Sequence, residues 1–273
     1  MKRNLLILAF VFFSISLNSQ ILIALLLGDK LNTGKIQFGL EAGWTFSTIT
    51  GLESNNFENN WDLGFYFDIK MKNQWYLDTG VLVKTTLGND ELTENDLEFL
   101  GFEDYDPDGR YSQRSNYFLI PVMAKYLFKN HIYVEAGPQF GLLTKGWIEY
   151  NYRDGDYDGT IKKYNTDMMN RIDAGIAAGA GFRLLKGLGW TVGAKYYYGF
   201  VNVYKERPGT KNSTIFLKLN IPMGLSDVQK GEIKEAKEKK KAKKESTEKY
   251  KKKQEKKKQK QIDKENKKTK TQQ

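Results

Sequence analysis

Apolar side chains recur at every second position in this chain, and that alternation limits the folds it can adopt. In the segment IQFGLEAGWTF (residues 36–46), the even-numbered positions are apolar and the odd-numbered positions are polar or glycine. Because successive side chains of a β-strand point to opposite faces, this spacing predicts a strand with one apolar and one polar face.

The alternation returns often enough to predict eight strands. They cover Ile36–Phe46, Trp61–Met71, Gln74–Thr86, Ser115–Phe128, His131–Thr144, Arg171–Leu184, Gly189–Phe200 and Ser213–Pro222. Their lengths suit strands that cross a bilayer at a tilt, which need roughly 9 to 11 residues each.

Short and long connections alternate between these strands. Three are tight turns, at 72–73, 129–130 and 186–188, and between them lie long polar stretches at 47–60, 87–114, 145–170 and 201–212. This asymmetry is typical of outer-membrane barrels, which have short periplasmic turns and long outward loops. The sequence therefore predicts an all-β fold, an eight-stranded antiparallel transmembrane β-barrel with both termini in the periplasm. A soluble β-sandwich or lipocalin-like barrel, with apolar faces pointing inward, is the alternative.

Aromatic residues near the strand ends predict two belts at the membrane–water interfaces. One belt comprises Trp44, Phe46, Trp147, Tyr150 and Phe200, and the other comprises Trp75, Tyr126, Phe128 and Trp190.

The N-terminus has the three regions of an export signal. Lys2 and Arg3 precede the apolar run Leu5–Phe13, and small or polar residues follow at most positions from 14 to 20. This order is typical of a secretory signal peptide, so we expect residues 1–19 to be cleaved. An uncut membrane anchor is the alternative. Residues 20–35 would then form a periplasmic N-terminal segment ahead of a barrel domain at 36–222.

The net charge of +10 belongs to the C-terminal segment. From Ser226 onward 20 lysines face 9 acids, a net charge of +11, so residues 1–225 carry −1. Because residues 226–273 lack an apolar stripe, they are predicted to form a Lys-rich basic periplasmic tail, either helical or disordered. The periplasm holds no nucleic acid, so its anions would be peptidoglycan, lipid headgroups or an acidic periplasmic protein. A plain solvated spacer is the alternative.

Four segments carry a likeness to a known family. They are NYFLIPVMAKYLF (116–128), YVEAGPQFGLL (133–143), DAGIAAGAGFR (173–183) and KYYYGFVNV (195–203). Together they resemble the PorT-like outer-membrane β-barrel family. The resemblance implies an eight-stranded barrel, and the founding member is an accessory of a protein-secretion and gliding apparatus. The family commonly has a glutamate where this chain has Leu119, and it supplies no catalytic residues to carry over.

Charged residues at the polar-face positions predict the content of the lumen. The acids are Glu41, Asp62, Asp68, Asp78, Glu135 and Asp173, and the bases are Lys70, Lys84, Lys125, Arg171, Arg183, Lys195 and Lys218. Because an eight-stranded barrel is only wide enough for side chains to fill it, this balance predicts a salt-bridged interior in place of an aqueous pore. A proton or ion path is the alternative.

Two of the long connections contain the opening of a calcium loop. Asp104, Asp106 and Asp108 in one, and Asp154, Asp156 and Asp158 in the other, each follow the pattern D-x-D-x-D-G. Alternate carboxylates can surround one cation, and the glycine permits the tight turn. Position twelve is Ser115 in one loop and Asn165 in the other, so neither has the bidentate glutamate. We expect weak calcium binding at most, and plain solvated turns are the alternative.

The sequence predicts an envelope component without catalytic activity. The chain has no cysteine and one histidine, His131, which removes most nucleophile–base and zinc chemistry. We expect a structural or interaction role in contact with outer-membrane lipid, with no cofactor beyond the weak calcium above. A calcium-dependent surface binder and a narrow solute channel are the alternatives.

Overall fold

A computed structural model describes residues 32, 35–102, 106, 109–154, 157–184, 189–223, 231 and 238. The predicted signal peptide lies outside the described residues. Of the N-terminal segment only Asn32 and Lys35 are described, and of the basic tail only Gly231 and Glu238. The predictions made for these three parts of the chain stay predictions.

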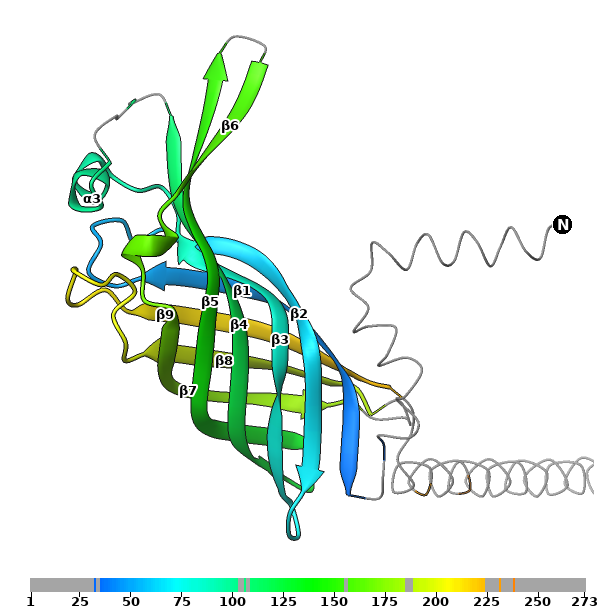
Figure 1. The fold of residues 1–273 in the computed structure, drawn as a ribbon. Helices are drawn as coiled ribbons and strands as arrows, with labels where there is room; N and C mark the ends of the chain where they lie inside the picture. The colour runs from blue at the N-terminus through cyan, green and yellow to red at the C-terminus, as the bar shows by residue number, and fades with distance from the viewer. Residues whose placement is uncertain are drawn as a thin grey trace, which may run out of the picture. The chain divides into compact units, whose positions relative to one another are not determined.

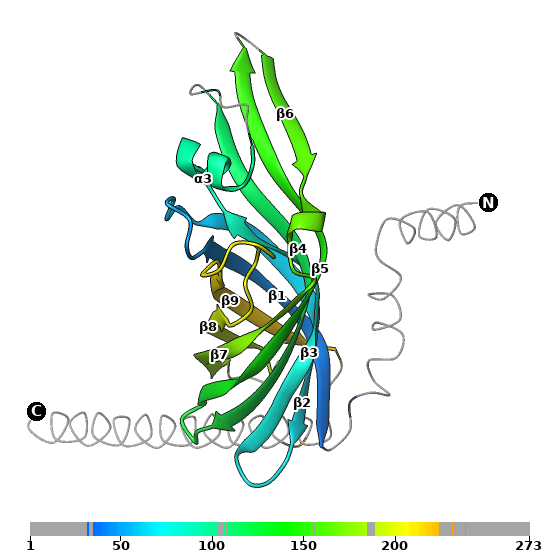
Figure 2. The same ribbon diagram turned by 60° about the vertical axis from the view of Figure 1, so that its left-hand side comes forward.

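Eight antiparallel strands form a closed ring (Figures 1 and 2). They are β1 (Ile36–Ile49), β2 (Glu58–Lys70), β3 (Trp75–Asn89), β4 (Arg110–Leu127), β5 (Ile132–Asp154), β7 (Ile172–Arg183), β8 (Thr191–Gly199) and β9 (Asn212–Pro222). Each strand of the ring pairs with the next one along the ring, and β1 pairs with β9 to complete it. The prediction of eight strands in a ring is therefore confirmed, and every strand of the ring has a partner on both sides over part of its length.

The two ends of the ring differ in the length of their connections. At one end, here named the turn end, β2 is joined to β3, β4 to β5 and β7 to β8. The turn between β4 and β5 closes when the His131 N–H donates to the Phe128 carbonyl (3.0 Å), and His131 takes a positive φ of 70°. The other end, here named the loop end, carries the longer connections.

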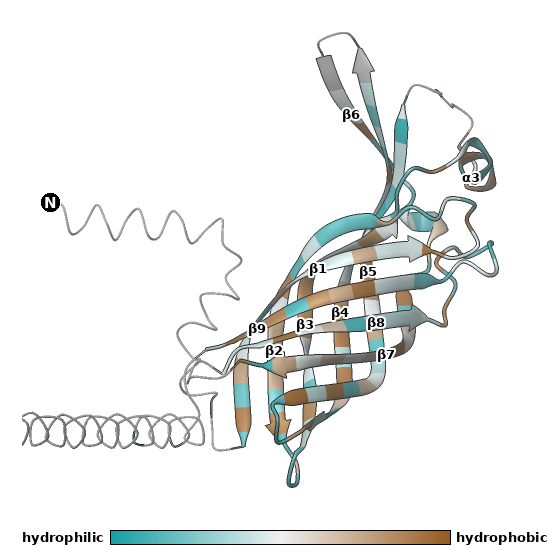
Figure 3. Ribbon diagram, turned by 180° about the vertical axis from the view of Figure 1, so that it is seen from behind, coloured by the Kyte–Doolittle hydropathy of each residue, from teal (hydrophilic) through white to brown (hydrophobic). Residues whose placement is uncertain are grey.

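Side-chain burial in this barrel is the reverse of that in a soluble protein. Large apolar residues are exposed on the outer face, for example Ile172 at 65% and Phe200 at 61%, whereas Glu41 at 3% and Lys195 at 2% are buried inside. Figure 3 shows how apolar residues, coloured brown, recur along the strands of the ring. This arrangement argues against the soluble alternative, whose apolar faces would point inward.

The predicted aromatic belts are present in part. At the turn end Trp75, Tyr126 and Phe128 pack in series, with ring centroids 5.0 and 4.8 Å apart. At the loop end Trp44 is 48% exposed, but Trp147 is largely buried against neighbouring side chains. Tyr150 stacks on Tyr111 instead of facing outward from the barrel.

A β-bulge redirects the loop end of β3. Residue pairing with β4 passes from Leu82↔Leu119 to Thr85↔Tyr117, so β3 contains one extra residue. Beyond the bulge β3 leaves β2 and lies over the inner face of β1. The Gly88 N–H donates to Ser47 Oγ (2.8 Å), and the Ile49 N–H donates to Asn89 Oδ1 (3.1 Å). The end of β3 therefore narrows the loop end of the lumen.

The long connections contain structure that the sequence did not reveal. A ninth strand, β6 (Tyr157–Tyr164), pairs with β5 alone and extends beyond the ring. A short helix, α3 (Glu94–Phe99), begins at Thr93, which forms a capping box with Asp96, and a 3-10 turn, η1 (Thr166–Met168), follows β6. At 145–170, where a long outward loop is expected, β5 continues to Asp154 and pairs with β6, so much of this connection is a β-hairpin.

Leu119 and Ile120 provide a matched test of the two faces of β4. Leu119 is fully buried in the apolar cluster of the lumen, whereas Ile120 is 43% exposed toward the outside. We expect Leu119→Ala to lower the free energy of unfolding by about 2 to 5 kcal/mol, because it leaves a cavity, and Ile120→Ala to lower it by less. Urea unfolding in lipid vesicles measures both. Equal losses would contradict the assignment of the two faces.

Candidate functional site

The turn-end half of the lumen is built around one buried ammonium group. Lys125 Nζ of β4 lies 2.9 Å from Asp68 Oδ1 and 2.7 Å from Asp78 Oδ2. These carboxylates come from β2 and β3, where the two aspartates are directly paired in register. Because the pairing places both carboxylates on the inner face, one lysine from the next strand reaches both.

A second lysine carries this network to the opposite wall. Lys218 Nζ of β9 lies 2.6 Å from Glu135 Oε1 and 3.6 Å from Asp78 Oδ2. The ring of Tyr133 lies beside both ammonium groups, with its centre 4.7 Å from Lys125 Nζ and 5.8 Å from Lys218 Nζ. The network thus joins five strands (β2, β3, β4, β5 and β9) through the middle of the lumen. We name it the lumen ion-pair network.

A small pocket lies beside this network toward the turn end. It is lined by Asp68, Tyr76, Lys125, Leu127, Tyr133, Arg183 and Thr191. Arg183 Nη2 donates to Gln37 Oε1 at 3.2 Å, which ties β7 to β1 across this pocket.

Two of the bases predicted for the lumen lie elsewhere. Lys84 is exposed, and its Nζ lies 3.5 Å from the centre of the Trp61 ring on the outer face. The β3 bulge is the reason, because the extra residue reverses the alternation between Leu82 and Thr85. Arg171 precedes β7, is exposed, and donates to main-chain carbonyls of β5. Within the part of the chain that the structure describes, Lys125, Lys195 and Lys218 are the only predicted bases that are buried in the lumen.

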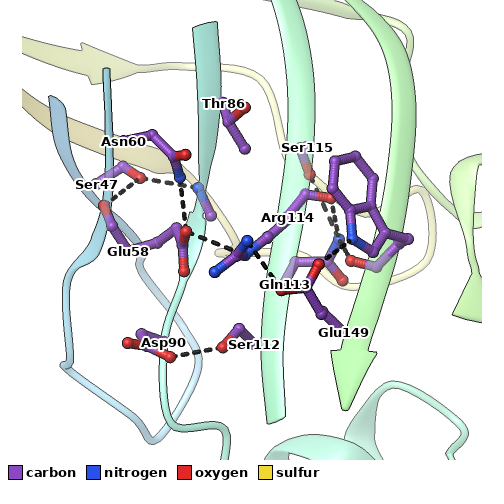
Figure 4. A network of polar contacts seen from close by, with 12 residues as sticks. Ser47, Glu58, Asn60, Thr86, Asp90, Ser112, Gln113, Arg114, Ser115 and Glu149 are labelled. Atoms are coloured by element: carbon purple, nitrogen blue, oxygen red, sulfur yellow. Dashed lines mark hydrogen bonds and ion pairs between the residues drawn. The ribbon is translucent and has the colours of Figure 1, made fainter. Parts of the chain in front are cut away.

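A polar network at the loop end joins strands that have separated there (Figure 4). Arg114 of β4 places Nε 3.1 Å from Glu58 Oε1 of β2 and Nη1 2.9 Å from Glu149 Oε1 of β5. Glu149 Oε2 also accepts from Trp147 Nε1 (3.1 Å) and pairs with Lys162 Nζ of β6 (3.3 Å). One guanidinium therefore links β2 to the extended β4–β5–β6 sheet after β3 has turned inward.

Asp90 holds the connection after β3. Its carboxylate pairs with the Arg110 guanidinium and accepts from Ser112 Oγ at 2.5 Å. Partial burial raises the pKa of Asp90, but the hydrogen bonds from Arg110 and Ser112 outweigh it and hold the pKa below its ordinary value. Since the depressed pKa belongs to the folded state, this contact stabilises the connection above the ordinary Asp pKa and is lost as pH falls through the folded value.

Side chains from two loops close the loop end of the lumen around Gln113. Gln113 is fully buried, and its Oε1 accepts from Asn165 Nδ2 (2.7 Å) and Tyr204 OH (2.9 Å). Its Nε2 donates to the Trp147 carbonyl at 3.1 Å. Asn165 follows β6, and Tyr204 lies between β8 and β9, so both connections fold over the opening. This contact could not be predicted from the sequence, because its members lie in stretches without periodicity.

The calcium prediction stays a prediction. Asp104, Asp108 and Asp156 lie outside the described residues, and only the backbone is described at Asp154 and Asp158. Asp106 is exposed, and its carboxylate accepts a hydrogen bond from the Tyr150 hydroxyl. Among the residues that the structure does describe, no group of three or more His, Cys, Asp or Glu side chains could hold a metal ion.

Comparison with known proteins identifies the family. The family described as outer membrane protein beta-barrel domain matches residues 24–205, about two thirds of the chain. The chain belongs to this family. Its location is therefore the outer membrane, where the apolar outer face meets lipid. Within the described part of the chain, no helix is both long and apolar enough to span a bilayer. No curated protein matches the chain.

Several solved barrels resemble the family member described here. The attachment invasion locus protein Ail of Yersinia pestis is 10% identical, with 69% of this chain and 99% of that chain covered and a TM-score of 0.39. Neisserial surface protein A is 8% identical (67% and 96% covered, TM-score 0.34), and OprG of Pseudomonas aeruginosa is 10% identical (70% and 94%, TM-score 0.30). At these values the likenesses carry no information on ligands or partners.

Removing Lys125 should destabilise this barrel strongly. Lys125→Met leaves two carboxylates in the lumen without their main cation, so we expect a loss of about 3 to 5 kcal/mol in the free energy of unfolding. The variant K125M/D68N/D78N also removes the two unpaired carboxylates, so it should recover most of the lost free energy of unfolding. Urea unfolding in vesicles measures both, with Lys129→Met, an exposed turn-end residue, as the matched control. A loss from Lys125→Met no larger than that of the control would show that the network contributes nothing.

Proposed function

We propose that this outer-membrane barrel is closed and non-enzymatic, and that it serves the envelope as a structural or interaction component. One observation carries the proposal: the lumen is filled from both ends. The lumen ion-pair network occupies the turn-end half, and Gln113, Asn165 and Tyr204 close the loop end.

The geometry favours a filled interior over a conducting one. Eight strands enclose a space that side chains can fill, and here Lys125 and Lys218 bridge walls that face each other across it. A permeating ion would have to break these contacts, and unpaired charges in such an environment are unfavourable.

We further propose that the loop end faces outward and both termini face the periplasm. Support comes from the asymmetry of the connections, because outer-membrane barrels place short turns in the periplasm and long loops outside. In this orientation β6, α3 and the end of β5 form the outward surface of the protein.

The non-enzymatic part of the proposal rests on the residues available for chemistry. The single histidine, His131, lies in the tight turn between β4 and β5. The buried carboxylates of the lumen ion-pair network are held by lysines and have no nucleophile in the network to activate.

A finer role follows from the PorT-like resemblance and the basic tail. We propose that the protein is an accessory of a protein-secretion apparatus and that residues 226–273 tether it to peptidoglycan or to an acidic periplasmic protein. The net charge of +11 on that segment supports an anionic partner.

Conductance tests the closed lumen directly. Purified protein in a planar bilayer should show no steady single-channel steps, because an ion crossing the lumen would have to break both the ion pairs and the contacts of Gln113. A porin reconstituted in parallel checks that channels can be seen. Reproducible ion-selective steps would instead establish the narrow solute channel.

Crosslinking in living cells tests the partner. We expect full-length protein to capture specific envelope proteins or peptidoglycan fragments, and a chain truncated at Ser226 to lose them, with the products identified by mass spectrometry. Raised salt should weaken the capture, because the attraction is electrostatic. Identical products with and without the tail would exclude the tether.

A further inference from the structure

Three basic residues lie at the loop end of β5, β7 and β9, which with β8 form one side of the ring. Lys145 lies on β5, Arg171 directly precedes β7, and Lys211 directly precedes β9. Lys145 and Arg171 are exposed, and Lys211 is half-buried. We name these three residues the basic patch.

Strongly exposed apolar side chains lie directly next to the basic patch. Leu142 is 50% exposed and is paired in register with Ile172, which is 65% exposed. Phe200 is 61% exposed, and its N–H donates to the Ala174 carbonyl at 2.8 Å. Because these side chains face lipid, the basic patch lies where acyl chains give way to headgroups.

Two of the three bases are held in place by the backbone. Arg171 Nη1 donates to the carbonyls of Leu143 (3.4 Å) and Thr144 (3.2 Å), next to Lys145. Lys211 Nζ donates to the Phe200 carbonyl at 2.5 Å. Carbonyl partners carry no formal charge, so they position both cations without forming an ion pair, and this reduces the entropy lost on binding an anion.

Among the described residues, no acid forms an ion pair with the basic patch, although the Asp173 carboxylate interacts electrostatically with Lys211. Asp173 is buried in the lumen, where its Oδ2 accepts from Asn212 Nδ2 at 2.8 Å. Asp167 in η1 is exposed, and its carbonyl accepts from Lys205 Nζ at 2.7 Å, which adds a further cation nearby. Lys145 has no ion-pair partner among the described residues.

The geometry points to a phosphorylated glycolipid of the lipid A type as the ligand of the basic patch. The patch reaches from β5 across β7 and β8 to β9, three inter-strand spacings or roughly 14 Å. That span exceeds one phosphate and suits two phosphates carried on a single headgroup, with acyl chains along Leu142, Ile172 and Phe200. Basic clusters beside apolar belts bind lipid phosphates in this way. The assignment of the lipid to the outer leaflet rests on the proposed outward orientation of the loop end.

Native mass spectrometry of the full-length protein in detergent tests this assignment. The probes are diphosphorylated lipid A, monophosphorylated lipid A, phosphatidylglycerol and inorganic phosphate. We expect wild type to bind the diphosphorylated form best, and K145Q/R171Q/K211Q to bind it on the order of 100-fold less, at about fivefold for each base. The control K72Q/K129Q/K163Q removes three exposed lysines elsewhere and should bind like wild type.

Several results would overturn the assignment. They are equal binding by the patch variant and the control, equal binding of phosphatidylglycerol and lipid A, or displacement of lipid A by millimolar inorganic phosphate. Lys145→Gln alone removes no side-chain hydrogen bond or ion pair among the described residues, so its expected fivefold loss remains measurable even if the Arg171 substitution impairs folding.

Orientation is measured separately. A Lys163→Cys variant should react with an impermeant thiol reagent in intact cells if β6 is outside. Lipid A binding without labelling would overturn the proposed orientation and keep the basic patch. Labelling without lipid A selectivity would overturn the assignment of the basic patch and keep the proposed orientation.

Discussion

The structure depends on one constraint: a ring of eight strands in lipid must satisfy its inward polar side chains with one another. Side chains fill a space that narrow, so a buried charge is stabilised by an opposite charge within reach. Lys125 meets this need by contacting Asp68 and Asp78, and Lys218 repeats the arrangement with Glu135. The strand register brings these groups together, so the ring and the lumen ion-pair network stabilise each other.

The loop end solves the same problem by a change in the backbone. One extra residue in β3 turns its last part over β1 and leaves β2 without a neighbour on that side. Arg114 then spans the separation by contacting Glu58 and Glu149. Closure by Gln113 becomes available only because β4 and β5 continue past the ring and bring the loops after β6 and β8 above it.

The strands could be predicted well from the sequence because lipid requires apolar side chains on the outer face. Since successive side chains alternate between faces, the pattern has a strict period of two. Ile36, where β1 begins, and Pro222, where β9 ends, agree with the alternation. It failed where the period is broken: Lys84 was placed inside because a bulge leaves no mark on the pattern. It also missed β6, whose sequence YDGTIKKY has charged residues on both faces and no membrane to impose an apolar one. The pairing partner of each lumen lysine needed the register, which composition does not contain.

Leu119 shows how the interior divides into layers of different chemistry. The PorT-like resemblance implies a glutamate at this position, yet here an apolar side chain is fully buried in the cluster that includes Leu82 and Leu143. A carboxylate in that cluster would need its own cation, and the fully buried lysines Lys125 and Lys218 already serve acids nearer the turn end. The apolar residue removes that requirement and separates the lumen ion-pair network from the polar contacts of the loop end. The proposed function accordingly assigns recognition of other molecules to the outer surfaces of the barrel.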